Sequence, residues 1–150
     1  QAVPYVASCH HEKLDGTGYY RGLKGEEIPF LSRIIAVADV FDALTSVRHY
    51  RNRMPVEKVA EILESGKGNH FDGRCVDTFN RMPSDRVLMV MESERDRKAS
   101  EDLSIFKHVS WQRLVELVSG SKPKRGEDGV RESFDRLYNF GLPEGYKALD

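Results

Sequence analysis

The sequence lacks the features that would mark a membrane protein or a nucleic-acid-binding protein. No apolar run approaches the roughly 18 residues that a transmembrane helix needs, and no basic and apolar leader opens the chain. The 23 Lys and Arg residues nearly balance the 24 Asp and Glu residues. The chain therefore has no excess of positive charge of the kind that indicates binding to nucleic acid or to an anionic membrane. Any phosphate must therefore be bound by a local basic pocket.

Cysteine is also scarce. The chain of 150 residues has two cysteines, Cys9 and Cys75, which are far apart and in no CxxC pattern. This usage predicts reduced thiols and a cytoplasmic location. Cys9 stands beside two histidines and is a candidate ligand, although a buried cysteine acting as a small apolar residue is the more common case.

Apolar residues recur with helical spacing along most of the chain, which predicts an all-α protein. The signals are prolines at helix starts, N-capping side chains and glycines at helix ends. They predict helices over 30–46, 55–65, 73–82, 85–97, 111–118 and 130–140, with Asp72, Ser84 and Ser110 as the N-caps of the third, fourth and fifth. The run "VLMVM" in the fourth of these leaves a strand as the alternative. Residues 12–29 contain four glycines and are predicted to form a loop.

His10 and His11 stand directly before this loop. Neighbouring side chains on a helix point about 100° apart, so both rings can reach one site only where the backbone turns. The glycine-rich loop supplies such a turn, and imidazole is a suitable ligand for zinc, iron or manganese. Taken alone, the pair is more typical of surface histidines near a loop.

Asp39 lies within a segment that is apolar on nearly every side, which predicts a buried helix. A carboxylate there is costly unless it is paired or bound to a metal. Asp42 follows one turn later on the same face, so one aspartate could be a ligand and the other could orient it. The alternative is an ion pair with an arginine such as Arg33.

Two further segments contain candidate binding residues. Arg48 and Arg51 would share a helical face and, with Tyr50 between them, could clamp a phosphate and stack a base. A basic helix end is the alternative. In "DGTGYY", Asp15 is a candidate ligand, cap or turn former, and an ordinary surface turn is the alternative.

Taken in order, "HHEKLDGTGYY", "IPFLSRIIAVADVFDALTSVRHYR" and "GNHFDGRCVDTF" closely resemble the second half of an HD-GYP domain over about residues 9–82. The family's patterns are HHExxDGxGYP, VADxFDAL and RxYR. The resemblance implies an all-helical metallohydrolase of the HD superfamily. It implies hydrolysis of cyclic di-GMP, or in some cases another cyclic dinucleotide, to linear pGpG or GMP. It also implies two or three divalent metal ions, most often iron or manganese.

The resemblance also implies roles for individual residues. The implied metal ligands are His10, His11 and Asp39, with Asp42 in support, and the implied substrate-binding residues are Arg48, Arg51 and Tyr19. The implied loop and partner residues are Asp15, Gly16, Gly18 and Tyr20. No catalytic residue is expected in this segment, because the family's general-acid lysine lies upstream.

The chain departs from the family pattern in three respects. Tyr20 replaces the proline of GYP, His49 replaces the proline of RPYR, and the chain contains no His-Asp dipeptide. Tyrosine in place of that proline frees the backbone of the loop. We therefore expect residues 1–82 to be the C-terminal half of an HD-GYP domain that is inactive by itself. We expect a helical extension over 83–118, a linker over 119–129, and a short helix with a tail over 130–150.

The resemblance leaves two main functional hypotheses. The first is a bacterial cyclic di-GMP phosphodiesterase with an upstream receiver or sensor domain, as in a two-component response regulator. Its expected partner is a GGDEF diguanylate cyclase, and a homodimer is expected. The second is a degenerate module that binds the dinucleotide or a cyclase without cleavage. A third and weaker hypothesis, hydrolysis of ordinary nucleotides, is disfavoured by the arginine pair and the DGxGY loop.

Overall fold

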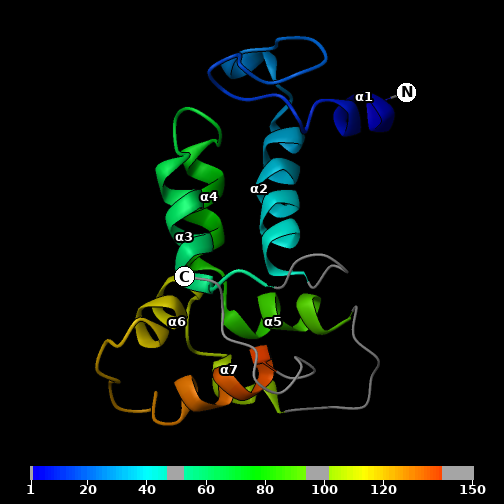
Figure 1. Ribbon diagram of the computed structural model, residues 1–150. Helices are drawn as coiled ribbons and strands as arrows, with labels where there is room; N and C mark the ends of the chain where they lie inside the picture. Colours follow the sequence, from blue (N-terminus) through cyan, green and yellow to red (C-terminus); the bar gives the residue numbers. More distant parts are fainter. Residues whose placement is uncertain (1, 47–52, 94–101, 140–150) are drawn as a thin grey trace. The chain divides into compact units, whose positions relative to one another are not determined.

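The computed structural model describes residues 2–46, 53–93 and 102–139, in which helices are joined by turns and loops (Figure 1). No β-strand occurs within those ranges, so the prediction of an all-α protein is confirmed. The chain divides into two compact units. The first contains Gln1–Leu44 and Lys58–Phe79, and the second contains Thr45–Glu57 and Asn80–Asp150. The predicted boundaries at residues 82, 118 and 129 stay predictions.

The first unit is built around four α-helices, α1 (Ala2–Ser8), α2 (Phe30–Thr45), α3 (Val56–Ser65) and α4 (Gly73–Arg81), with a short 3-10 helix at Gly25–Glu27. The helices begin where the sequence predicts. α2 follows Pro29, and α3 follows Pro55. α4 is capped by Asp72, whose Oδ1 accepts the main-chain N–H of Arg74 at 3.0 Å.

Side chains of α2, α3 and α4 and of the segments next to them form the core of this unit. The buried apolar residues are Cys9, Ile28, Val37, Phe41, Val59, Leu63, Phe71, Cys75 and Val76. The Phe41 and Phe79 rings also meet, with their centroids 4.9 Å apart. The predicted apolar stripe of α3 therefore faces the core at Val59 and Leu63. The contact between Phe41 and Phe79 packs α2, which carries Asp39, against α4.

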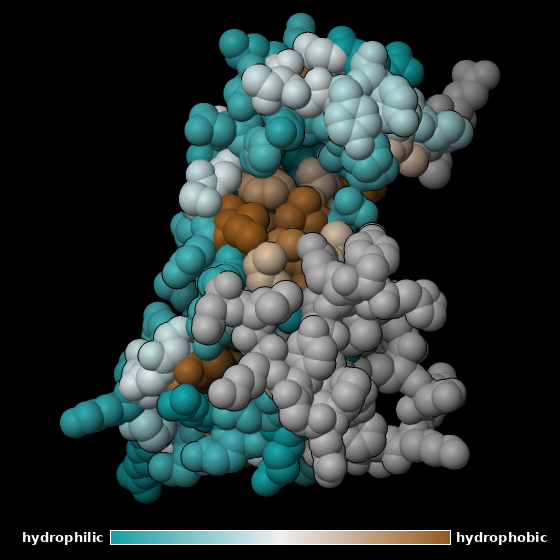
Figure 2. All heavy atoms as spheres, viewed as in Figure 1, coloured by the Kyte–Doolittle hydropathy of each residue, from teal (hydrophilic) through white to brown (hydrophobic). Residues whose placement is uncertain are grey.

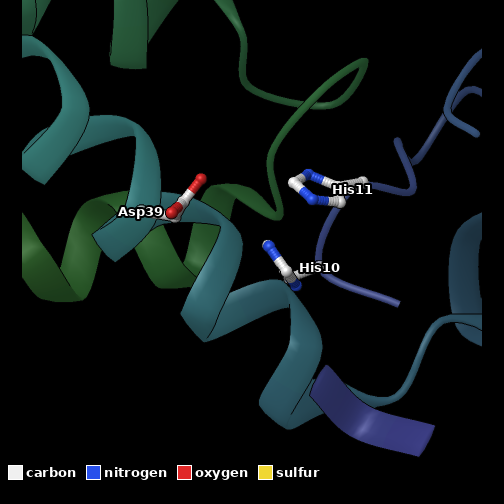
Figure 3. A group of neighbouring side chains, drawn as sticks. All are labelled: His10, His11 and Asp39. Atoms are coloured by element: carbon white, nitrogen blue, oxygen red, sulfur yellow. The ribbon is translucent and has the colours of Figure 1, made fainter. Parts of the chain in front are cut away.

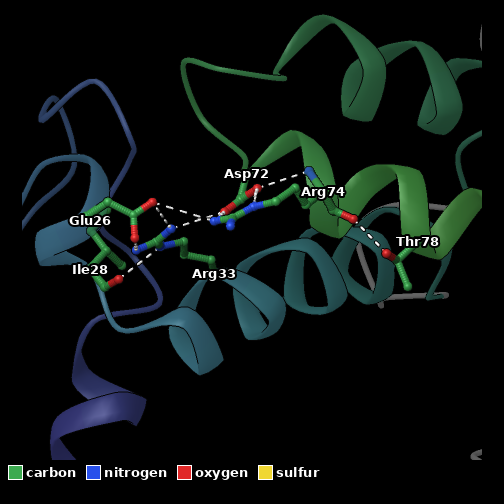
Figure 4. Close-up of polar contacts among 6 residues, drawn as sticks. All are labelled: Glu26, Ile28, Arg33, Asp72, Arg74 and Thr78. Atoms are coloured by element: carbon green, nitrogen blue, oxygen red, sulfur yellow. Dashed lines mark hydrogen bonds and ion pairs between the residues drawn. The ribbon is translucent and has the colours of Figure 1, made fainter.

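An ion-pair network centred on the buried side chains of Arg33 and Asp72 ties the start of α2 to the start of α4 (Figure 4). Arg33 is buried and donates to the Ile28 carbonyl at 2.9 Å, to Asp72 at 3.1 Å and to Glu26 at 3.0 Å. Arg74 donates to the same Asp72 carboxylate at 2.6 Å. These bonds, first from Arg74 and then from Arg33, hold the pKa of Asp72 well below its ordinary range.

The prediction that α2 is buried on nearly every side is wrong. Ser32, Arg33, Val37 and Phe41 face the interior, but Leu31 is 60% exposed. Phe30, Ile34 and Ile35 are also exposed, and Figure 2 shows apolar side chains gathered over this helix. Within the described ranges, the neighbouring elements cover one face of α2 and leave its second apolar face open to solvent. Asp39 lies on an exposed part of the helix.

The second unit contains α5 (Ser84–Ser93), a 3-10 helix at Leu103–Phe106, α6 (Trp111–Val118) and α7 (Val130–Asn139). The helix prediction for the run after Ser84 is confirmed over the strand alternative. α5 begins at Ser84 itself, where the sequence predicts the cap, and the Ser84 hydroxyl donates to the Val109 carbonyl at 2.8 Å. Ser110 caps α6 as predicted, by accepting the main-chain N–H of Arg113 at 3.2 Å.

The segment 119–129, which the sequence predicts as a linker, is bonded to α6. Arg113 donates to Glu127 at 2.8 Å and to the carbonyl of Lys122 at 2.9 Å. The Arg113 guanidinium lowers the pKa of Glu127 to about 2. The buried residues of α7 are Val130, Phe134, Leu137 and Tyr138, as the periodicity predicts. None of the described helices has the length and apolar character needed to cross a membrane.

Candidate metal centre

Three side chains of the first unit form a candidate metal centre (Figure 3). His10 and His11 follow α1, and Asp39 comes from α2. One ligand atom from each residue lies within 4.8 Å of the other two. The histidines are half-buried and Asp39 is exposed. The structure therefore brings together the three residues that the sequence singles out as metal ligands.

The two histidines can face one place because the helix ends just before them. α1 stops at Ser8, and a turn follows in which the Cys9 carbonyl accepts the N–H of Glu12 at 3.2 Å. The two imidazole centroids lie 3.8 Å apart. The Ser32 hydroxyl donates to the Val6 carbonyl at 2.8 Å and ties α1 to α2. Cys9 is fully buried, which agrees with the apolar role rather than with a ligand.

The hydrogen bond of His10 fixes its tautomer. Nδ1 of His10 contacts the main-chain carbonyl of Ala7. A carbonyl oxygen can only accept, so Nδ1 carries the proton and the lone pair of the neutral ring lies on Nε2. Metal-binding histidines are commonly oriented by such a bond from the other ring nitrogen. His10 is therefore prepared to bind a metal through Nε2.

The donor set fits a divalent transition metal. Two imidazoles and one carboxylate are the ligands of many non-haem iron sites, and manganese also accepts these ligand types. Three protein donors leave coordination positions open for further ligands, water or substrate. The chemistry of the residues present therefore fits the metal that the resemblance implies.

Glu12, which is not among the predicted site residues, organises the loop after the histidines. Its side chain is buried, with 4% of the residue exposed. Its carboxylate accepts the main-chain N–H of Arg21 at 2.7 Å and that of Leu23 at 3.1 Å. The sequence signal for this residue is the glutamate of the family pattern HHExxDGxGYP, which does not by itself indicate what the side chain bonds.

Tyr19 and Tyr20 lie beside the metal centre. The Tyr19 ring stacks on the His11 ring, with centroids 5.0 Å apart and an angle of 15° between the planes. Tyr20 has a φ of 98° and is the one described residue other than glycine with a positive φ. Proline is locked near a φ of about −65°, so the family's proline could not adopt this conformation.

Asp15 is a turn former in this structure. Its Oδ1 accepts the main-chain N–H of Thr17 at 2.8 Å and the Thr17 hydroxyl at 2.7 Å, and these bonds lower the pKa of Asp15. Gly16 has a φ of 82°, in the left-handed region. Gly18 is required for a different reason, because a Cβ there would lie 2.4 Å from the backbone nitrogen of Lys13.

Asp42 is not among the three clustered residues, and the two predicted arginines cannot be compared with them. Asp42 is exposed on α2, one turn beyond Asp39, and its supporting role stays a prediction. Arg33, the alternative partner for these aspartates, is bonded to Glu26 and Asp72 instead. Arg48 and Arg51 belong to the segment 47–52, outside the described residues.

Several proteins named as phosphodiesterases are similar to this chain. A phosphodiesterase of Vibrio cholerae serotype O1, "3'3'-cGAMP-specific phosphodiesterase 3", is 50% identical over 94 residues, which is 60% of this chain and 20% of the relative. The "Cyclic di-GMP phosphodiesterase response regulator RpfG" of Xanthomonas campestris pv. campestris is 49% identical over 81 residues, or 54% of this chain and 21% of the relative. A "Cyclic di-GMP phosphodiesterase" of Thermotoga maritima is 39% identical over 126 residues, or 84% of this chain and 31% of the relative. The chain thus spans no more than a third of these relatives.

A family model described as "HD domain" matches residues 1–75, half of the chain. The matched region contains His10, His11 and Asp39 together with the loop that Glu12 organises. The chain therefore belongs to the HD domain family, as the resemblance of its motifs to HD-GYP domains predicts.

Proposed function

We propose that this chain is part of a metal-dependent phosphodiesterase that hydrolyses a cyclic dinucleotide, with cyclic di-GMP as the first candidate. The observation that supports the proposal most directly is the cluster of His10, His11 and Asp39, whose ligand atoms lie within 4.8 Å of one another. The names of the relatives support the substrate class, since they are cyclic di-GMP and 3'3'-cGAMP phosphodiesterases. The products would be linear pGpG or GMP.

In this proposal His10 binds the metal through Nε2, while His11 and Asp39 supply the other two donors from this chain. Asp42 supports Asp39 from the next turn of α2. A bound divalent metal lowers the pKa of water and stabilises charge on a phosphodiester. Two or three ions are proposed, with iron or manganese preferred because of the donor set.

The proposed substrate contacts of the chain extend the metal centre. Arg48 and Arg51 would bind the phosphates, since guanidinium groups bind such oxygens bidentately. Tyr19 lies against His11 with 58% of its surface exposed and is in a position to contact the substrate. The loop residues Asp15, Gly16 and Gly18 would hold Tyr19 in place and contribute to the partner surface.

We further propose that residues 1–82 form the C-terminal half of a catalytic domain. The exposed apolar face of α2 supports this, because an apolar helix face of this kind is normally covered by another element. The covering half would supply the remaining metal ligands and the general-acid lysine. Residues 83–118 would be an extension, residues 119–129 a connection, and residues 130–150 a final helix and tail.

The wider setting is proposed from the same family resemblance. The full protein would work in the cytoplasm in second-messenger signalling, with an upstream receiver or sensor domain. A GGDEF diguanylate cyclase and a second copy of the protein are the proposed partners. One relative is itself named as a response regulator, which supports the receiver domain.

The test is turnover by the full-length protein loaded with Mn²⁺ or Fe²⁺. We expect hydrolysis of cyclic di-GMP, of 3'3'-cGAMP or of both, followed by chromatography of the products. Asp39→Ala should abolish both metal binding and turnover, whereas Glu61→Gln, on the exposed part of α3, should leave both unchanged. Retained turnover in Asp39→Ala would overturn the proposal.

The rival hypothesis, a degenerate module that binds without cleaving, is distinguished in the same experiment. It requires wild-type protein that binds the cyclic dinucleotide but gives no product with Mn²⁺ or Fe²⁺ in excess. Fewer than one bound ion per chain in the full-length protein would favour this rival. Turnover by residues 1–150 alone would contradict the proposed division of the catalytic domain.

A further inference from the structure

Three aromatic rings form a continuous series from the candidate metal centre to the surface of the loop. His11, a proposed ligand, stacks on Tyr19 at 5.0 Å. Tyr19 then meets Tyr20, with ring centroids 5.2 Å apart at 56°, and Tyr20 lies 6.2 Å from His11. The rings therefore lead outward from the place where a phosphodiester would be cleaved.

The outer rings of this series are open to solvent. Tyr19 is 58% exposed and Tyr20 is 76% exposed. An aromatic ring that is open on one face and supported by another ring is a stacking surface for a planar ligand. Every nucleobase has such a planar face, and stacking on aromatic side chains is a general way in which proteins bind bases.

Main-chain hydrogen bonds of the neighbouring residues hold Tyr20 in its position. Its φ of 98° is a conformation that residues with a side chain rarely adopt, and such strain collects at functional sites. The next residue, Arg21, is held through its main-chain N–H by the buried carboxylate of Glu12 at 2.7 Å. Tyr19 is held through its own N–H, which donates to the His11 carbonyl at 3.4 Å.

Arg21, the residue after Tyr20, adds a positive charge to the exposed loop, and its guanidinium packs on a different ring, that of Tyr5 in α1. The guanidinium carbon of Arg21 lies 5.1 Å from the centre of the Tyr5 ring, and both residues are exposed. A ligand that is both aromatic and anionic would match this combination of rings and charge. A nucleotide has both properties, whereas an apolar protein surface has no need of the guanidinium.

We infer that Tyr20, together with Tyr19, forms a stacking platform for one purine base of the cyclic dinucleotide. This inference rests on the proposed function and adds to it a base-binding residue at the position where the sequence departs from the family pattern. Tyr20 acts as a specificity-determining residue, because it binds the base and takes no part in the chemistry at the phosphate.

The test compares Tyr20→Ala, Tyr20→Phe and Tyr20→Trp with wild-type full-length protein. Loss of one stacking ring at an exposed site should raise KM for cyclic di-GMP about 5- to 30-fold. The value of kcat should change far less, because the ring does not touch the reacting bond. The Phe and Trp variants keep a ring and should restore KM. Glu61→Gln changes an exposed side chain of α3 outside the proposed binding surface and should leave KM unchanged.

Competitive inhibition shows whether the base is the group recognised. GMP carries a purine base, and inorganic phosphate does not. Tyr20→Ala should raise the inhibition constant of GMP by the same factor as KM and should not change that of phosphate. An unchanged KM, equal effects on the two inhibitors, or no rescue by Phe and Trp would overturn the inference, and the ring would then serve a protein partner or the loop itself.

Direct binding separates failure of this inference from failure of the proposed function. If the wild-type protein has no turnover, the affinity for cyclic di-GMP is measured by calorimetry in the same variants. An affinity that falls in Tyr20→Ala and returns in Tyr20→Phe supports the base platform although hydrolysis has failed. An affinity that does not depend on Tyr20 overturns the platform whether or not the protein is an enzyme.

Discussion

The buried carboxylate of Glu12 accepts the main-chain N–H of Arg21 at 2.7 Å, nine positions later in the chain. With the second bond, from Leu23 at 3.1 Å, it closes the loop that carries Tyr19 and Tyr20. Glu12 itself follows His11 directly. Glu12 therefore connects the backbone next to His11 with the loop that positions Tyr19 and Tyr20.

We predict that Glu12→Gln loosens this loop. The Gln side chain replaces one of the two accepting oxygens with an NH₂ group, which would face a main-chain N–H. A buried N–H without an acceptor should lower the free energy of unfolding by about 1–3 kcal/mol. Hydrogen exchange measured by NMR should become faster at the amides of Arg21 and Leu23.

Glu27→Gln is the matched control for that prediction. Glu27 is an exposed glutamate of the same loop, and its Oε2 accepts the main-chain N–H of Lys24 at 2.9 Å. Its replacement should affect exchange at Lys24 and leave Arg21 and Leu23 protected. Equal protection of Arg21 and Leu23 in Glu12→Gln and in wild type would show that the carboxylate does not hold the loop.

Gly18→Ala should displace the loop from His11. The added Cβ would lie 2.4 Å from the Lys13 nitrogen and 2.5 Å from Cα of Glu12, and both are backbone atoms that cannot turn aside. We expect a stability loss of about 1–3 kcal/mol and a lower affinity for Mn²⁺. Gly73→Ala is the control, because its nearest contact would be 4.0 Å away. Thermal unfolding and metal titration of both variants check the prediction.

Asp72 should make the first unit sensitive to acid. Its pKa in the folded state lies below the ordinary value because Arg74 and Arg33 bond to the carboxylate. The unfolded chain therefore takes up the proton first as the pH falls, so stability increases with pH in this range. The contribution of Asp72 is fully present at neutral pH and is lost as the pH falls below about 4.

Asp72→Asn tests this dependence on pH. It should reduce the acid slope of stability, measured by urea unfolding at a series of pH values. It should also cost about 3 kcal/mol at neutral pH, because Arg33 is left buried with one fewer partner. Thr78→Val removes a hydroxyl that donates to the Arg74 carbonyl at 2.7 Å but no titrating group. A slope that is the same in Asp72→Asn as in Thr78→Val would contradict the assignment.

Metal binding should stabilise the full-length protein against heat. A ligand that binds only the folded state at 100 times its Kd adds about 2.7 kcal/mol of stability. We therefore expect Mn²⁺ or Fe²⁺ to raise Tm and a chelator to reverse the rise. Asp39→Asn should remove most of the shift, whereas Glu61→Gln should retain it. A full shift in Asp39→Asn would exclude that residue as a ligand.

Local signals in the sequence predicted most of the helices. Pro55 and Gly66 bound α3, Ser110 caps α6, and the stripe from Val130 to Tyr138 gives the buried face of α7. These signals depend on neighbours three or four residues apart, so they can be found in the sequence alone. For the same reason the sequence did not show that Ser84 would donate to Val109, a partner 25 positions away.

The candidate metal centre was predicted from the sequence as a set of residue types, and its three members do lie together. The motif pattern supplied His10, His11 and Asp39, because imidazole and carboxylate in that order are typical of the family. Glu12 matches the glutamate of the family pattern, but no spacing in the sequence indicates what its side chain does. Its role depends on two main-chain N–H groups of a loop whose path cannot be read from residue spacing.

The sequence by itself thus determined the helical class, the helix starts and ends, and the identity of the candidate ligands. The tertiary structure decided which faces are covered, and it left Leu31 and Asp39 exposed on a helix that the sequence predicts to be buried. It also decided the positive φ of Tyr20 and the pairing of Arg33 with Asp72, 39 positions away. The physical reason is that hydrophobic periodicity and capping act within a few residues, whereas burial, ion pairing and loop strain depend on contacts between segments far apart in the chain.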